Sequence, residues 1–348
     1  MAGGPSADTA ASSDMGRRGG RGAVSWSTWK EEGGGMSASC WCYTVNQNYL
    51  LPALVSALQL RAYTDRRGDR IVVVLIDDEG EVSREAAEAM RPCGIEIVVV
   101  PPSLMMGYPL YCARLFLCQI IDCSRFDFIN YIDADTQFVG EVAAFADANP
   151  RPGSILAVPD IMSIVIDHPS KSFQAHGTYF TQLGIPEHHQ RIYFNTGVMK
   201  FRPSDWGAIS KECLAFLRRH GLADLRYPDQ DALNIVMDGG QTLASFRWNF
   251  PAFFIGCGFE GVVEPSILHF MSRPRPWDGP FPPWGAAAHQ PYLRFVERFP
   301  QLQNLFAPSR NVRMMRYMLQ QLFKVKTEPW GTAFIRERVA AFEARAFV

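Results

Sequence analysis

Two carboxylates one residue apart, Asp133 and Asp135, follow a short hydrophobic run that begins at Phe128. The run is rich in residues that favour β-strands, so the sequence predicts a buried strand with both acids at its carboxyl end. In an open α/β sheet, ligands bind at the carboxyl ends of the strands. Two acids at that edge can hold one divalent cation together with phosphate oxygens, and we therefore predict the active site here.

His269 is a candidate third ligand, because it stands at the end of a later strand-like run. A neutral imidazole can complete an Asp, Asp, His set suited to Mn²⁺, or to Mg²⁺ as a similar ion. Arg273 and Arg275 follow directly and can meet phosphate charge. A buried, hydrogen-bonded core histidine is the alternative for His269, and an ordinary capped turn is the alternative for the two acids.

The elements that must position these residues alternate between strand and helix. Strand-like runs occur at 40–45, 71–76 and 95–100, and helical periodicity separates them. The run at 71–76 is nearly continuous in β-branched residues, as expected for a parallel strand covered on both faces. The pattern predicts an α/β protein with a doubly wound sheet.

Regularity is weaker after residue 140. We expect strands at 155–158 and 193–201, a helix capped by Asp205 or Ser204, and a second helix over 229–237. The stretch 160–190 contains four histidines and few periodic signals, so we interpret it as a loop region over the site.

Length and composition set the domain boundaries that we expect. The 348 residues, 47% of them hydrophobic, can bury a large core. Residues 1–35 contain nine glycines and no apolar periodicity, which predicts a disordered segment. We expect a catalytic domain over 36–285 and a helical, basic extension over 286–348.

Charge and hydropathy restrict the partners and the location. A formal net charge of −1 gives no reason to expect nucleic-acid binding. No run reaches the roughly 18 to 20 apolar residues of a membrane-spanning helix, and the N-terminus lacks a hydrophobic signal segment. These features predict a cytoplasmic protein. The eight cysteines fit reduced core thiols, with a structural zinc at Cys40 and Cys42 as the alternative.

The C-terminal segment 310–348 differs in character. It has eight Lys or Arg against three Glu, a local charge of +5, interleaved with Met, Leu and aromatic residues. One hypothesis is an interfacial helix that holds the protein on anionic lipid at the inner face of the membrane. The alternative is a helix packed on the domain with a solvated basic face.

Several short segments carry a resemblance to a known family and occur in the family's order. They are the runs 44–49, 111–115, 131–136, 195–197, 228–234 and 269–277. Together they resemble the retaining glycosyltransferases of family 8, which include glycogenin, bacterial lipopolysaccharide galactosyl- and glucosyltransferases and galactinol synthase. The resemblance implies a GT-A fold: a single Rossmann-like mixed sheet flanked by helices, here with a C-terminal helical extension.

The activity that the resemblance implies is metal-dependent transfer of a hexose with retention of configuration. The donor would be UDP-glucose or UDP-galactose, and the acceptor a saccharide, a lipid-linked saccharide or another hydroxyl compound. Mn²⁺ would neutralise the departing UDP. A second copy of the chain, in a homo-oligomer, is a further candidate partner.

The resemblance also implies site residues. The donor-binding residues are Thr44, Asn46, Asn48, Tyr49, Arg114, Asp133, Ala134, Asp160, Thr196, Gly197, Ser272 and Arg275. The metal ligands are Asp133, Asp135 and His269. The catalytic residues are Asn195, Asp229, Gln230 and Asp231.

The implied mechanism places Gln230 beneath the anomeric carbon. An amide is a poor nucleophile compared with a carboxylate, so we favour front-face attack over a covalent intermediate, with Asp229 and Asp231 holding sugar hydroxyls. Two positions depart from the family: Ser272 stands where glycine is usual and Arg275 where lysine is usual. Arginine can still hold a diphosphate, bidentately.

Two other functions compete with this hypothesis. The Asp-x-Asp-x-Thr pattern also matches the nucleophile motif of haloacid-dehalogenase-like phosphatases, with Asp133 as nucleophile and Asp135 as acid. That hypothesis leaves Asn195 and His269 without a task. A catalytically silent protein that only binds sugar nucleotides is the third alternative.

Overall fold

The computed structural model describes residues 39–64, 68–259, 261–327 and 332–347. The prediction of disorder for residues 1–35 lies outside these ranges. Ser37–Val348 group into one compact unit. The boundary that we expect between residues 285 and 286 stays a prediction.

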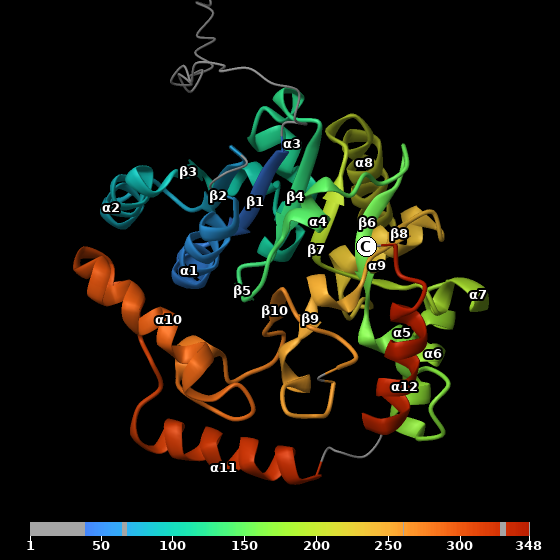
Figure 1. The fold of residues 1–348 in the computed structure, drawn as a ribbon. Coiled ribbons are helices and arrows are strands. Elements are labelled where there is room, and N and C mark those ends of the chain that lie inside the picture. Colours follow the sequence, from blue (N-terminus) through green and yellow to red (C-terminus); the bar gives the residue numbers. More distant parts are fainter. Residues whose placement is uncertain (1–38, 65–67, 260, 328–331, 348) are drawn as a thin grey trace, which may run out of the picture. The chain divides into compact units, whose positions relative to one another are not determined.

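The main sheet has seven strands, and its α/β character confirms the predicted fold class (Figure 1). In spatial order the strands are β3 (Ile95–Val100), β2 (Arg70–Ile76), β1 (Ser39–Val45), β4 (Phe128–Ile132), β7 (Phe194–Phe201), β6 (Ile155–Pro159) and β8 (Thr242–Leu243). Neighbouring strands are parallel except for β7, which runs antiparallel to both β4 and β6.

The reversed direction of β7 brings the site residues to one edge. β1, β4 and β6 all end there, whereas β7 begins there, since Val198 pairs with Ile132 and Phe194 pairs with Pro159. Asn195, Thr196 and Gly197 therefore lie beside the acids that follow β4. Because β7 is antiparallel, site residues at its amino end lie beside site residues at the carboxyl ends of the parallel strands.

A second sheet, which we did not predict separately, holds three short strands. They are β5 (Thr136–Phe138), β10 (Ile267–His269) and β9 (Phe250–Pro251). His269 pairs with Thr136 across the antiparallel β5–β10 contact and with Pro251 across the parallel β10–β9 contact. The turn with Asp133 and Asp135 is the passage from β4 in the large sheet to β5 in the small one.

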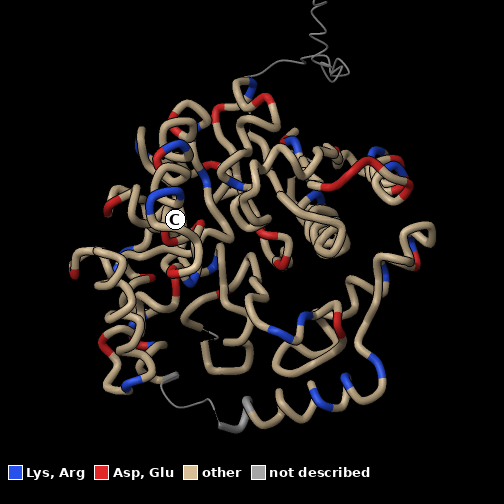
Figure 2. Tube along the Cα trace, turned by 180° about the vertical axis from the view of Figure 1, so that it is seen from behind, with Lys and Arg blue, Asp and Glu red and all other residues tan. Residues whose placement is uncertain are grey.

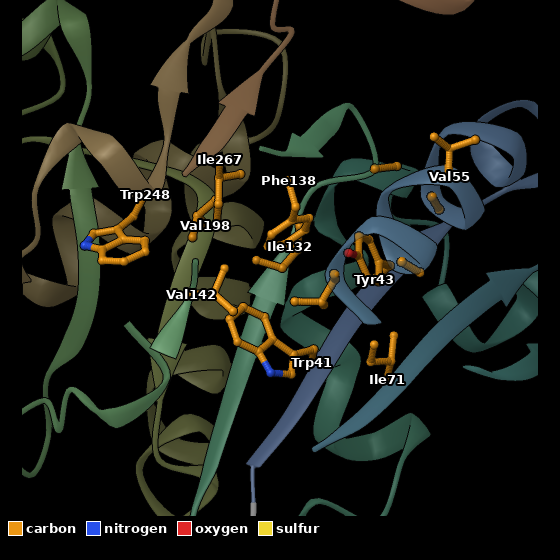
Figure 3. Close-up of a cluster of buried hydrophobic side chains, with 14 of the residues drawn as sticks. Trp41, Tyr43, Val55, Ile71, Ile132, Phe138, Val142, Val198, Trp248 and Ile267 are labelled. Carbon is orange, nitrogen blue, oxygen red and sulfur yellow. The ribbon is translucent and has the colours of Figure 1, made fainter. Parts of the chain in front are cut away.

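Alternation along β1 separates the core into two layers. Trp41 and Tyr43 face the layer shown in Figure 3, together with α1 and the small sheet. Cys40 and Cys42 face the opposite layer, which includes Trp206. The helices that surround the sheets are α1 (Gln47–Thr64), α2 (Glu81–Met90), α3 (Leu117–Ile120), α4 (Ala143–Asp147), α8 (Pro203–His220), α9 (Pro228–Met237) and α10 (Gly285–Arg298).

The loop that we expected over 160–190 is largely helical, so that interpretation is wrong. It contains α5 (Ile161–Val165), α6 (Lys171–Gln182) and α7 (Glu187–Gln190). Asp160 begins α5 by accepting a hydrogen bond from Met162 N at 2.9 Å. Only Tyr179 and Phe180 of α6 are buried, so its apolar face is too narrow to give a clear helical period.

All eight cysteines are free thiols. In the described part of the chain, neither Cys40 nor Cys42 belongs to a group of three or more His, Cys, Asp or Glu side chains close enough to hold one metal ion. The zinc alternative therefore has no structural support there, and both thiols serve as apolar core groups.

Two further helices complete the described chain: α11 (Asn311–Thr327) and α12 (Thr332–Glu343). The Glu343 carboxylate of α12 accepts hydrogen bonds from Ser245 Oγ at 2.6 Å and from Phe246 N at 2.7 Å. Phe342 packs edge-on against Phe246. No helix within the described ranges combines the length and the apolar character needed to cross a membrane.

The contacts of Glu343 predict the effect of removing it. Glu343→Ala leaves the buried N–H of Phe246 without an acceptor, so the free energy of unfolding should fall by about 1–3 kcal/mol. Glu337→Ala, an exposed position on the same helix, is the control and should change stability by less than about 0.5 kcal/mol. Urea unfolding followed by tryptophan fluorescence measures the stability of both variants. Equal unfolding midpoints for the two would show that Glu343 does not stabilise the packing of α12.

Candidate active site

The structure brings the three predicted metal ligands together. His269 Nε2 lies 3.1 Å from Asp135 Oδ1 and 3.8 Å from Asp133 Oδ2. One ligand atom from each residue falls within 4.8 Å of the others. Two carboxylate oxygens and one imidazole nitrogen form a donor set that suits a divalent cation such as Mn²⁺.

The remaining oxygen of each carboxylate is held by other side chains. Asp133 Oδ1 accepts hydrogen bonds from Arg114 Nη2 at 2.9 Å and Tyr131 Oη at 3.2 Å. Asp135 Oδ2 accepts one from Arg275 Nη1 at 2.5 Å. Each acid is therefore oriented so that one oxygen faces His269, which is the arrangement a shared cation needs.

Gly197 leaves room for the imidazole. A Cβ added at this glycine would lie 2.3 Å from His269 Cε1 and 2.8 Å from His269 Nδ1, distances that atoms do not tolerate. Gly197, which we predicted to contact the donor, therefore also provides the space that the His269 ring occupies. Together with the donor set and the oriented carboxylates, this clearance shows that the residues fit a metal ion.

Electrostatics keep Asp135 charged. Burial alone would raise the pKa of this carboxyl, but the charges and hydrogen bonds of His269 and Arg275 outweigh burial and hold the pKa well below its usual range. The ionised form is the one that can bind a cation.

Arg114 links the metal site to α9. Its guanidinium donates to Thr196 O at 2.6 Å, contacts Asp133, and has Nε 3.0 Å from Asp229 Oδ2. It also lies over the Tyr131 ring, with Cζ 4.6 Å from the centroid. Burial raises the pKa of Asp229, although the ion pair with Arg114 opposes that shift. Arg114 is thus shared by two acids.

The predicted sugar-contacting residues form a second cluster. Asp160 Oδ2 accepts hydrogen bonds from Asn195 Nδ2 at 3.0 Å and Gln230 Nε2 at 3.1 Å. Gln230 Oε1 accepts one from Thr196 N at 3.2 Å. These residues come from the junction of β6 and α5, from β7 and from α9, and they meet at the same edge as the metal ligands.

Asp231 is connected to this cluster through Tyr193, whose hydroxyl accepts a hydrogen bond from Gln230 Nε2 at 3.3 Å. It is fully buried, and its carboxylate accepts hydrogen bonds from Tyr193 Oη at 2.6 Å and from Tyr179 Oη. Burial raises its pKa. Contact between this carboxylate and a sugar hydroxyl would require those bonds to open, so the geometry supports an anchoring task that joins α9 to α6.

The predicted nucleotide-binding residues lie at the end of β1 and the start of α1. Thr44 Oγ1 is 2.9 Å from Tyr131 Oη. Asn46 Oδ1 is buried and has no hydrogen-bond partner. Tyr49 packs edge-on against Trp277, with ring centroids 6.0 Å apart. Asn48 is exposed.

The loop after β10 supplies the predicted phosphate-binding arginine. Arg275 Nε is buried without a hydrogen-bond partner, while its backbone N–H donates to Asp278 Oδ2 at 2.8 Å. Ser272 is partly buried earlier in the loop, Arg273 is exposed, and Ala134 is buried between the two acids. Arg275, rather than Arg273, is therefore the arginine placed against the metal ligands.

Sequence reasoning missed two polar contacts of the site. Tyr131 lies in the strand-like run that begins at Phe128, and its hydroxyl lies between Thr44 and Asp133. Asn249 lies 2.8 Å from His269 Nδ1 through its Oδ1 atom. No spacing pattern indicated Asn249, because it precedes a strand of only two residues.

A mixed α/β sheet flanked by helices, with an Asp, Asp, His cluster at the ligand-binding edge, is the arrangement that the GT-A prediction implies. Residues 40–279 match glycosyl transferase family 8, so the chain belongs to that family. The predicted resemblance is confirmed, and the chain is a glycosyltransferase. The phosphatase and silent-binder hypotheses have no support from this result.

Solved structures agree on the fold. The galactosyltransferase LgtC in complex with donor and acceptor sugar analogs superposes with a TM-score of 0.59 and 21% identity, covering 76% of this chain and 96% of that one. The bifunctional glycosyltransferase WbbM gives 0.57 and 17%, covering 78% and 52%. Apo GlyE of Streptococcus pneumoniae TIGR4 gives 0.54 and 14%, covering 79% and 66%. No curated protein matches the sequence.

The clearance at Gly197 predicts a specific defect. Gly197→Ala should displace His269 and weaken binding of Mn²⁺ alone by about 10-fold or more, because the imidazole loses its position. Titration of Mn²⁺ followed by electron paramagnetic resonance measures the affinity. Gly207→Ala is the matched control, since a Cβ there meets nothing within 4 Å. Equal affinity in both variants would contradict the prediction.

Proposed function

We propose that the protein transfers glucose or galactose from a UDP-sugar to a hydroxyl of a saccharide or lipid-linked acceptor, with retention of configuration and with Mn²⁺. The observation that carries this proposal is the meeting of two clusters at one sheet edge. One is the ligand set of Asp133, Asp135 and His269; the other joins Asp160, Asn195 and Gln230. The first cluster would hold a diphosphate through the cation, and the second would contact the sugar attached to that diphosphate.

The nucleotide would lie along the end of β1. The unpaired buried Oδ1 of Asn46 can accept a hydrogen bond from a base, and Tyr49 offers an aromatic face nearby. The Thr44 and Tyr131 hydroxyls lie between this region and Asp133. The nucleotide-binding residues are thus continuous with the metal ligands.

The diphosphate would be held by Arg275 and by the cation. The buried Nε of Arg275 has no hydrogen-bond partner and lies beside the ligands. A divalent metal supplies charge neutralisation for a departing phosphate. A histidine ligand favours Mn²⁺ over Mg²⁺, which prefers an all-oxygen environment. The arginine that replaces the usual lysine can form two parallel hydrogen bonds to phosphate.

The sugar would lie over the Asp160, Asn195 and Gln230 cluster, with Asp229 beside it. Gln230 uses both ends of its amide within the protein, and an amide is a weak nucleophile. We therefore favour front-face attack, in which the nearby acids stabilise positive charge at the anomeric carbon. Asp231 would act indirectly by fixing Tyr179 and Tyr193.

We also propose that the C-terminal region contacts anionic lipid, which would place the protein at the inner face of a membrane. Val312, Met315 and Leu319 of α11 are 74%, 60% and 62% exposed. The helix has Arg313 and Arg316 but no acidic residue (Figure 2). An exposed apolar face flanked by arginines suits a membrane surface. A homo-oligomer stays a prediction.

A donor screen tests the proposed reaction. Release of UDP should occur from UDP-glucose or UDP-galactose with Mn²⁺ present and should cease when the metal is chelated. Asp135→Asn should lower the rate by about 100-fold or more, because a metal ligand loses its charge. The exposed Asp224→Asn is the control and should be unaffected. Failure to cleave any UDP-sugar would contradict the proposal, and nuclear magnetic resonance of the product would test retention.

Vesicle co-sedimentation tests the lipid contact. Wild-type protein should bind vesicles that contain phosphatidylglycerol, and the double change Arg313→Glu with Arg316→Glu should weaken binding by about 10-fold or more, since each surface cation contributes about 1 kcal/mol. Arg84→Glu with Arg91→Glu, two exposed arginines elsewhere, makes the same charge change as a control. If both pairs of substitutions weaken vesicle binding equally, the net charge of the protein rather than α11 is responsible for the binding.

A further inference from the structure

A directed chain of side-chain hydrogen bonds joins the proposed sugar cluster to the metal ligands. Asn195 Nδ2 donates to Asp160 Oδ2 at 3.0 Å. Asn249 Nδ2 donates to Asn195 Oδ1 at 2.8 Å. Asn249 Oδ1 then lies 2.8 Å from His269 Nδ1. All four residues are buried, so solvent does not replace these contacts.

Chemistry fixes the direction of the chain. The Asp160 carboxylate only accepts hydrogen bonds, so Asn195 must turn its NH₂ group toward it. The backbone N–H of Gly197 donates to Asn195 Oδ1 at 2.9 Å, which confirms that orientation independently. Asn249 must then offer its own NH₂ to Asn195 and its oxygen to His269.

The consequence concerns the histidine tautomer. Because Asn249 Oδ1 is an acceptor, His269 Nδ1 must carry a hydrogen. Nε2, the nitrogen that faces Asp133 and Asp135, can then present its lone pair to a cation. A hydrogen bond to the other ring nitrogen is the usual way in which proteins fix a metal-binding histidine.

We propose that Asn249 is a positioning residue that holds His269 in its metal-binding tautomer and couples it, through Asn195, to the sugar cluster. The proposal rests on the proposed metal-dependent function. Both hydrogen bonds of the Asn249 side chain go to site residues and none serves only to secure its own segment. The backbone already holds that segment, since Pro251 pairs with His269.

Two substitutions separate the two tasks of Asn249. Asn249→Ala removes the acceptor for His269 Nδ1 and should weaken binding of Mn²⁺ alone by about 10- to 100-fold. Asn249→Asp keeps an acceptor for Nδ1 but loses the donor to Asn195. It should bind Mn²⁺ no more weakly than wild type, while kcat/KM for the UDP-sugar falls by about 10-fold.

The measurements are Mn²⁺ titration by electron paramagnetic resonance, without nucleotide, and steady-state UDP release, both on the full chain. Asn130→Ala is the matched control: Asn130 is a fully buried asparagine whose Nδ2 donates to Ser39 Oγ at 2.8 Å. It should lower stability but leave Mn²⁺ affinity unchanged. Circular dichroism verifies folding, and the isosteric Asn249→Asp variant remains a test if Asn249→Ala does not fold.

The outcomes distinguish the inference from the proposed function. If wild type and Asn249→Ala bind Mn²⁺ equally, the inference is overturned and the proposed function stands. If Asn249→Asp loses Mn²⁺ as Asn249→Ala does, the tautomer explanation is wrong. If the wild-type protein binds no Mn²⁺, both fail, since the inference depends on a metal site.

Discussion

Mutual repulsion between two largely buried carboxylates is the constraint on which the site depends. Asp133 and Asp135 lie one residue apart in a turn where little water reaches them, and without nearby cations their charges would oppose folding. Arg114 and Arg275, from two distant segments, offset this repulsion. Each donates a hydrogen bond to one oxygen of one carboxylate. The ion pair of Arg275 with Asp135 therefore helps to fix the position of the loop after β10. Arg114 also pairs with Asp229, so it helps to fix the start of α9.

The sequence was most informative where one local pattern decides the structure. Short hydrophobic runs at 40–45, 71–76 and 95–100 identified three parallel strands, and the acids after 128–132 marked the ligand-binding edge, because both depend on short-range regularities. The small sheet was missed, since strands such as Phe250–Pro251 are too short to show alternation. The inward direction of Asp231 was missed too, because the neighbouring Asp229 and Gln230 on the same helix face the site.

Asn249 shows a different limit of sequence reasoning. Its importance comes from the partners that the fold assembles around it, Asn195 and His269, which lie 54 and 20 residues away along the chain. Neither distance follows a period or a motif. Metal ligands can be sought in the sequence because only a few residue types bind metals. Residues that orient those ligands, such as Asn249, are not limited in this way.

The turn between β4 and β5 has a thermodynamic consequence. Asp133 directly follows β4 of the large sheet, whereas Asp135 directly precedes β5 and His269 ends β10 of the small one, so the ligand set spans both sheets. A cation bound there would act as a cross-link between two layers of the fold, and its binding free energy would add to the free energy of unfolding. The resistance of the small sheet to local opening would then vary with the free concentration of the ion, which makes metal supply a determinant of rigidity as well as of turnover.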